Sequence, residues 1–132
     1  MKIESHEEKL RESIEVIKES IRIGILERQR TIGFNASAAA IDMLEIILHE
    51  TKHISPGFII KHEWFNSKNK IKDKFGFDFP GKNKLIHLIS KIESERNKLC
   101  YGRPRNKTEI QEVLDVFNKL KKEFEYIRQR VN

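Results

Sequence analysis

Apolar residues recur every three or four positions through most of the chain, which is the spacing of amphipathic α-helices. The first such stretch runs from Glu4 to about Arg30, with Glu and Lys between the apolar positions. Gly33 predicts a turn, and Phe34 to Glu50 is expected to form a second helix. The apolar stripe of the first helix consists of Leu10, Ile14, Ile17, Ile21 and Ile25.

Small side chains at positions 36–40 favour close approach of neighbouring backbones, so the second helix is predicted to be the central, most buried one. Ser55-Pro56-Gly57 breaks the pattern, and a third helix is expected from Phe58 to about Phe75. An aromatic connector, expected to cover the core, follows with Phe75, Phe77, Phe79 and Pro80.

A fourth helix is predicted from Lys84 to Tyr101, ended by Gly102. A capping box of Thr108 and Gln111 predicts the start of a long fifth helix. The stripe of the fourth helix is Leu85, Ile89, Ile92, Arg96 and Leu99. The fifth carries a heptad-like stripe of Ile110, Val113, Phe117, Leu120, Phe124, Ile127 and Val131.

Short connections between such helices predict an all-α fold: an antiparallel up-and-down bundle of about five helices, formed by residues 1–132 as a single domain. The chain has 132 residues, 38% of them hydrophobic, which is enough for one core. A single cysteine, Cys100, excludes an intrachain disulfide and is expected to be a small buried apolar residue. Without an apolar leader or a long uncharged apolar run, we expect a cytoplasmic protein with no membrane attachment.

The charge of the fourth-helix stripe is the best clue to function. A guanidinium among aliphatic side chains needs a negative partner, so something anionic should face Arg96. Glu93, Asp42 or Glu45 would serve structurally, and a phosphate of RNA or of a nucleotide would serve functionally. Snorkelling of the arginine stem at a helix end is a third interpretation. The formal charge of +6 is compatible with a polyanionic partner, although acidic residues are interleaved with the basic ones.

Around Arg96-Asn97, the sequence resembles the HEPN superfamily, whose signature is an Arg, often followed by a polar residue, with a His several positions later near the end of a core helix. The helix order, the segment from Gly33-Phe34-Asn35 to Ala40 and the long last helix extend the resemblance over nearly the whole chain. It implies a small helical bundle. Active members are metal-independent ribonucleases, often toxins paired with a minimal nucleotidyltransferase, in which Arg and His of two subunits face a dimer groove.

The resemblance implies that Arg96 clamps a phosphate and that Asn97 orients it. The chain departs from the family where the motif histidine is expected, because Tyr101 stands there and no histidine follows His87. A phenol gives up its proton much less readily than an imidazolium at neutral pH. Tyr101 would therefore assist catalysis weakly, hydrogen-bond a phosphate or stack on a base, while Arg103 and Arg105 neutralise phosphates beside it.

Three functions follow from these observations. The first is a homodimer that binds RNA or a nucleotide between its two Arg96 motifs and that belongs to a toxin–antitoxin or nucleotidyltransferase pair, with metal-independent RNA cleavage by Arg96 and Tyr101. The second is a catalytically degenerate binding or regulatory partner, with Arg96 held in a structural ion pair. The third is an ordinary bundle that dimerises through its last helix. None of them calls for a cofactor.

The remaining histidines are expected to carry no chemistry. His49-Glu50-Thr51-Lys52-His53 spells the zinc-protease pattern, but Lys52 is unsuited to it and Ser55-Pro56 ends the helix at once, so no metal is expected. A solvated helix end, shared by His62 and Glu63, is the expected setting. His6 is assigned to a charged N-terminal turn, and His87 to the surface.

Overall fold

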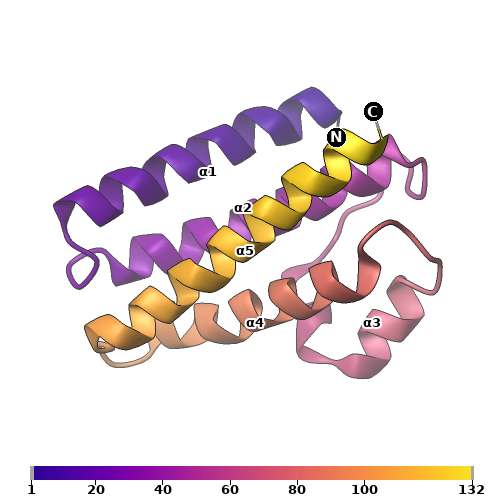
Figure 1. The fold of residues 1–132 in the computed structure, drawn as a ribbon. Coiled ribbons are helices and arrows are strands. Elements are labelled where there is room, and N and C mark those ends of the chain that lie inside the picture. The colour runs from indigo at the N-terminus through magenta and orange to yellow at the C-terminus, as the bar shows by residue number, and fades with distance from the viewer. Residues whose placement is uncertain (1, 132) are drawn as a thin grey trace.

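The computed structural model describes residues 2–131, which form helices and loops and contain no strand (Figure 1). This confirms the predicted all-α bundle of about five helices. The helices are α1 (Ile3–Ile23), α2 (Gln29–Glu50), α3 (Lys68–Lys74), α4 (Lys82–Tyr101) and α5 (Lys107–Val131), with the 3₁₀ helix η1 (His62–Asn66) before α3.

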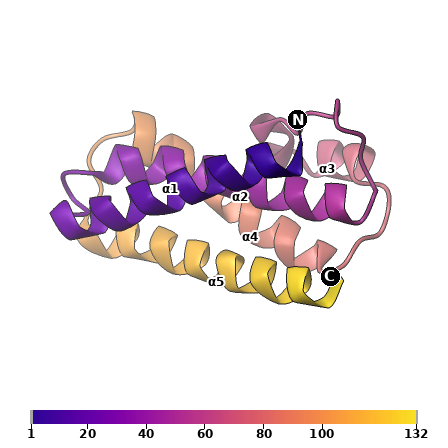
Figure 2. The same ribbon diagram turned by 90° about the horizontal axis from the view of Figure 1, so that it is seen from above.

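The four long helices lie roughly along one another and alternate in direction, while η1 and α3 lie at the end of the bundle that also holds both chain termini (Figures 1 and 2). α2 packs against α1, α4 and α5, and α4 packs against α5 and η1. The predicted central position of α2 is therefore confirmed. All eight residues of α2 from position 41 to position 48 are buried, because neighbours cover several sides of this helix.

α2 is the one helix among residues 2–131 that is long and apolar enough to cross a membrane, but 78% of that apolar stretch is buried inside the bundle. The core helix of a soluble protein passes the same test, so this is weak evidence for a membrane span.

The turn between the first two helices lies earlier than the sequence predicted. α1 ends at Gly24, whose φ of 147° is open to glycine and unfavourable for other residues, and α2 begins at Gln29. Gly33, the predicted turn, is instead a buried residue inside α2. A Cβ atom at Gly33 would lie 2.9 Å from Leu99 Cβ, so this glycine allows α2 and α4 to approach closely. The apolar spacing hid the true turn because Ile25, just after it, is also buried.

The predicted third helix is mostly not α-helical. Residues 58–61 belong to no helix, η1 buries Trp64 and Phe65, and α3 is short and capped by Ser67, whose Oγ accepts a hydrogen bond from the Lys70 backbone. Aromatic side chains at one end of the bundle can be buried from a loop or a turn as well as from a helix, so their spacing does not require an α-helix. The aromatic connector covers the core as predicted, with Phe75 and Phe79 buried.

α5 starts one residue before the predicted capping box. Asn106 is the cap, because its Oδ1 accepts a hydrogen bond from the Glu109 backbone at 2.9 Å, while Gln111 bonds Asp115. From Ile110 to Ile127 the heptad-like stripe is buried against the other helices of the same chain. Because the chain itself covers this stripe, the stripe is not exposed for the contact with a second copy that the third hypothesis requires.

Candidate functional site

Arg96 lies near the end of α4 and is only partly buried, contrary to the expectation of a core position. The buried charge on α4 is Glu93, which is 3% exposed. The guanidinium of Arg96 lies over the ring of Phe34 on α2, 5.3 Å from its centre. Within residues 2–131, no ion pair with a carboxylate is formed by Arg96.

All three carboxylates proposed as structural partners of Arg96 are engaged elsewhere. Glu93 Oε1 accepts hydrogen bonds from Ser37 Oγ at 2.6 Å and from His62 Nδ1 at 2.9 Å. Asp42 and Glu45 face a histidine of α1. The expected structural ion pair is therefore absent among the described residues, and the positive charge of Arg96 is left for another anion.

A hollow of about 460 Å³ lies beside the contact between η1 and α4. Its residues come from two segments far apart in sequence, which meet because η1 packs on α4. Both residues of the Arg96-Asn97 motif line it, together with the histidine held by Glu93. The lining consists of Ile60, Lys61, His62, Glu63, Asn66, Glu93, Arg96 and Asn97.

His62 is the site residue that the sequence reasoning missed, since it was assigned to a solvated helix end. Its side chain is 39% exposed, and its Nδ1 is held by the buried Glu93. A carboxylate can only accept, so Nδ1 carries a proton, and in the neutral ring Nε2 has the lone pair. Nothing in the sequence spacing indicates this pairing, because 31 residues separate His62 from Glu93.

Ser37, His62 and Glu93 have the composition of a serine-hydrolase triad but not its geometry. Ser37 is fully buried, and its hydroxyl donates to Glu93 rather than to the histidine's lone pair. No substrate reaches such a serine. Its role is to help hold the carboxylate that orients His62.

Beside the hollow, two aromatic rings and a second arginine form what we call the Phe34–Tyr101 platform. The two rings meet edge to face at 6.0 Å, and Arg30 lies 5.5 Å from the Phe34 ring centre and 5.8 Å from that of Tyr101. Tyr101 is 65% exposed and does not line the hollow itself. The exposed Tyr101 ring beside Arg30 is suited to stacking on a base, and Arg30 was not singled out from the sequence.

The loop after α4 is tied to the first turn of α2 by Gln29. The Gln29 amide donates to Leu99 O at 3.1 Å, and its oxygen accepts from the Arg105 backbone at 2.8 Å. The Arg105 side chain lies 3.5 Å from Glu109 and is partly neutralised. Arg103 is exposed and forms no ion pair within residues 2–131, so of the two predicted loop cations it is the freer one.

Cys100 is buried as predicted, at 7% exposure, with its Sγ 3.7 Å from the backbone oxygen of Arg30. Burial raises the pKa of its thiol, and the nearby guanidinium groups of Arg96 and Arg30 offset this only partly. The thiol is therefore a poor nucleophile.

A second polar cluster lies between α1 and α2. His6 is buried at 4% exposure, so its assignment to a charged turn was wrong; the amphipathic pattern of α1 places it on the buried face. Its Nδ1 lies 2.8 Å from Asp42 Oδ1, and its ring stacks on that of His49 at 5.7 Å. Burial raises the pKa of Asp42 and lowers that of His49.

The zinc-protease pattern at the end of α2 does not assemble. Glu50 is held by Arg128, and His53 lies beyond the helix end with its ring stacked on Phe77 at 5.1 Å. His87 is exposed, as expected.

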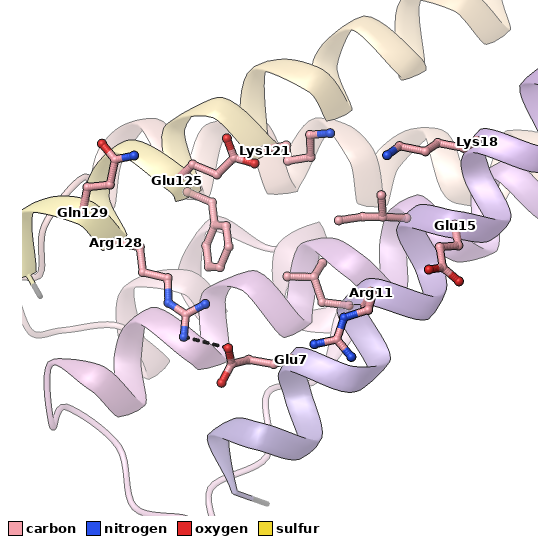
Figure 3. Close-up of a pocket in the computed structure, with 11 residues that line it drawn as sticks. Glu7, Arg11, Glu15, Lys18, Lys121, Glu125, Arg128 and Gln129 are labelled. Carbon is pink, nitrogen blue, oxygen red and sulfur yellow. Dashed lines mark ion pairs between the residues drawn. The ribbon is translucent and has the colours of Figure 1, made fainter.

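A larger groove, of about 640 Å³, runs between α1 and α5 (Figure 3). Figure 3 shows charges of both signs along its walls and the ion pair of Arg128 with Glu7 across one end. It contains no imidazole and no concentration of one charge, so it offers less chemistry than the smaller hollow. Its lining is Glu7, Leu10, Arg11, Ile14, Glu15, Lys18, Lys121, Phe124, Glu125, Arg128 and Gln129.

No protein-family model, curated protein or solved structure matches this chain.

Proposed function

We propose that this chain is a HEPN-like protein that binds RNA at the hollow between η1 and α4 and cleaves it there without a metal ion. One observation carries the proposal: Arg96, with no carboxylate partner in residues 2–131, shares a hollow with His62, whose Nε2 is not engaged by Glu93. The Arg96-Asn97 motif near the end of α4 and the long α5 support the HEPN-like assignment.

In the proposed reaction, a ribose 2′-hydroxyl attacks the adjacent phosphorus. His62 Nε2 accepts the hydroxyl proton, and Arg96 stabilises the negative charge that develops on the phosphate oxygens. The bond from phosphorus to the 5′ oxygen breaks, a water molecule protonates this leaving oxygen, and a 2′,3′-cyclic phosphate remains, while Tyr101 on the adjoining platform stacks on a flanking base. Asn97 orients the phosphate, and Arg30 and Arg103 contact the flanking backbone.

In this proposal, His62 is the proton acceptor in place of the motif histidine that the sequence lacks. The motif position for a histidine holds Tyr101, and an imidazole from η1 now supplies a better proton acceptor at the same end of α4. Glu93 keeps the ring in one orientation, as the carboxylate of a catalytic triad does.

We further propose that two copies place their hollows on a shared groove and that the protein acts in the cytoplasm with a minimal nucleotidyltransferase as a toxin–antitoxin pair. The net charge of +6 supports a polyanionic ligand. Light scattering tests the dimer, and co-purification with a nucleotidyltransferase encoded beside this chain tests the pair.

The deciding experiment incubates labelled RNA with tag-free protein in EDTA, with circular dichroism in the same buffer to confirm folding. We expect cyclic-phosphate products from the wild type, and a loss of about 100-fold or more in Arg96→Ala and in His62→Gln. His87→Gln, on the exposed side of α4, is the matched control and should cleave as the wild type does.

Binding is measured on the same samples by fluorescence anisotropy at two salt concentrations. Binding without cleavage, weakened by Arg96→Ala, would establish the degenerate binding partner instead of the nuclease. Neither cleavage nor salt-dependent binding would overturn the proposal entirely.

A further inference from the structure

The cluster between α1 and α2 brings two imidazoles and a carboxylate to one point inside the bundle. One donor atom from each of His6, Glu45 and His49 lies within 4.8 Å of the other two. Glu45 and His49 are one turn apart on α2, and His6 comes from the facing side of α1. His6 and Glu45 are 4% and 5% exposed, so these ligand atoms are removed from bulk water.

Two ring nitrogens in this cluster have no hydrogen-bond partner although they are buried: His6 Nε2 and His49 Nε2. His6 Nε2 lies 2.6 Å from Glu45 Oε2, but the two groups are not aligned for a hydrogen bond. Orphaned buried nitrogens are costly in a folded protein, and each is a site where a further ligand is expected.

Each ring is held through its other side. His6 Nδ1 lies 2.8 Å from Asp42 Oδ1, and the backbone of Ile54 is the hydrogen-bond partner of the His49 ring. When each ring is neutral and these partners accept from Nδ1, the lone pair is on Nε2. Metal-binding histidines are oriented in this way, by a carboxylate or a backbone carbonyl on the nitrogen that does not bind the metal.

The charge of the cluster also favours a cation. Asp42 and Glu45 both lie beside His6 in this buried cluster, and when both are ionised a protonated His6 balances only one of their two charges. A divalent ion would balance the two carboxylates.

We propose that His6, Glu45 and His49 bind one Zn²⁺ ion, which joins α1 to α2, with Asp42 as the positioning residue for His6. Two nitrogens and one oxygen are a ligand set that zinc accepts, and a water would complete a tetrahedron. Tetrahedral ligands at zinc distances lie about 3.4 Å apart. Ligand atoms that are now as much as 4.8 Å apart must therefore move closer by side-chain rotation. His6 Nε2 and Glu45 Oε2, which are 2.6 Å apart, must move slightly further apart.

An entry path lies beside His49. A hollow of about 400 Å³ at the helix end is lined by His49, Lys52, Ile54 and residues 2–4, so solvent approaches the cluster on the side of His49. The proposed site is separate from the hollow lined by Arg96. It is also different from the zinc-protease pattern, because the two have only His49 in common.

The test is titration of tag-free protein with Zn²⁺ by isothermal calorimetry, after EDTA treatment and dialysis into chelator-free buffer. We expect one ion per chain, a higher unfolding temperature in zinc, and the visible absorption of a four-coordinate site when Co²⁺ replaces Zn²⁺. His49→Gln and Glu45→Gln should weaken zinc binding by about 100-fold, and Asp42→Asn by about 10- to 100-fold.

His53→Gln and His87→Gln are matched controls that remove histidines outside the cluster and should bind zinc as the wild type does. His49→Gln is the decisive variant because it leaves the His6–Asp42 contact intact, and circular dichroism confirms that it folds. Zinc binding unchanged in His49→Gln would overturn the proposal. So would the absence of stoichiometric binding in the wild type, which would identify the cluster as a buried imidazolium held by two carboxylates.

Discussion

The guanidinium of Arg96 lies 5.3 Å from the centre of the Phe34 ring, and this aromatic face takes the place where a carboxylate was expected. A ring positions a guanidinium without cancelling its charge. The contact between α2 and α4 thus holds Arg96 at the edge of the hollow with its charge available to a phosphate.

The first prediction separates the position of Arg96 from its charge. Phe34→Leu removes the cation–π contacts of this ring with Arg96 and Arg30, so it should weaken RNA binding about threefold and should leave the salt dependence unchanged. Arg96→Ala should lower the slope of log affinity against log salt by about one, because one phosphate contact is lost. Anisotropy titrations at several salt concentrations measure both effects. Phe34→Tyr is the control, and equal slopes for Arg96→Ala and wild type would contradict the proposed phosphate contact.

The second prediction concerns the close approach of α2 and α4. Gly33→Ala should destabilise the protein by about 1 to 3 kcal/mol, because its new Cβ would meet the buried Leu99 and Cys100. Alanine ordinarily stabilises a helix relative to glycine, so the sign of the change is diagnostic. Gly57→Ala, where a Cβ atom meets nothing within 4 Å, should change stability by about 0.5 kcal/mol or less. Urea unfolding followed by circular dichroism measures both, and a stabilised Gly33→Ala would show that the two helices are less tightly packed.

The third prediction tests how α5 is joined to α1 and α2. Burial disfavours the charge of Arg128, but its hydrogen bonds to Glu50 and Glu7 outweigh this and raise its pKa. Arg128→Ala should cost about 1 to 3 kcal/mol of unfolding free energy, because it leaves two carboxylates without their shared cation. Arg130→Ala removes an exposed cation two residues further along the same helix and should cost about 0.5 kcal/mol or less. Equal losses in the two variants would mean that the ion pairs contribute nothing specific.

The fourth prediction is that the thiol of Cys100 reacts slowly in the folded protein. Burial raises its pKa, so less thiolate is present at a given pH than in a free cysteine. Its rate of alkylation by iodoacetamide should keep rising at pH values where that of free cysteine levels off. Unfolding in urea should increase the rate by about tenfold or more at mildly alkaline pH. The same rate in urea and in native buffer would show that the thiol is open to solvent.

The helical class, the central position of α2, the apolar stripe of α5 and the end of α4 at Gly102 were all predictable from the sequence. Each depends on local spacing or on one terminating residue, which tertiary contacts here reinforce. The turn at Gly24 was not predictable in this way, because the same apolar periodicity continues on both sides of it.

The residues of the candidate sites were only partly predictable from the sequence. The sequence by itself singled out Arg96-Asn97, since a cation in an apolar stripe stands out without any structure. Only the tertiary structure placed His62 in the same hollow, Phe34 under Arg96, and His6 beside Glu45 and His49. The physical reason is that spacing along a chain specifies which face of a helix a residue occupies, whereas the partner it meets depends on how separate helices pack.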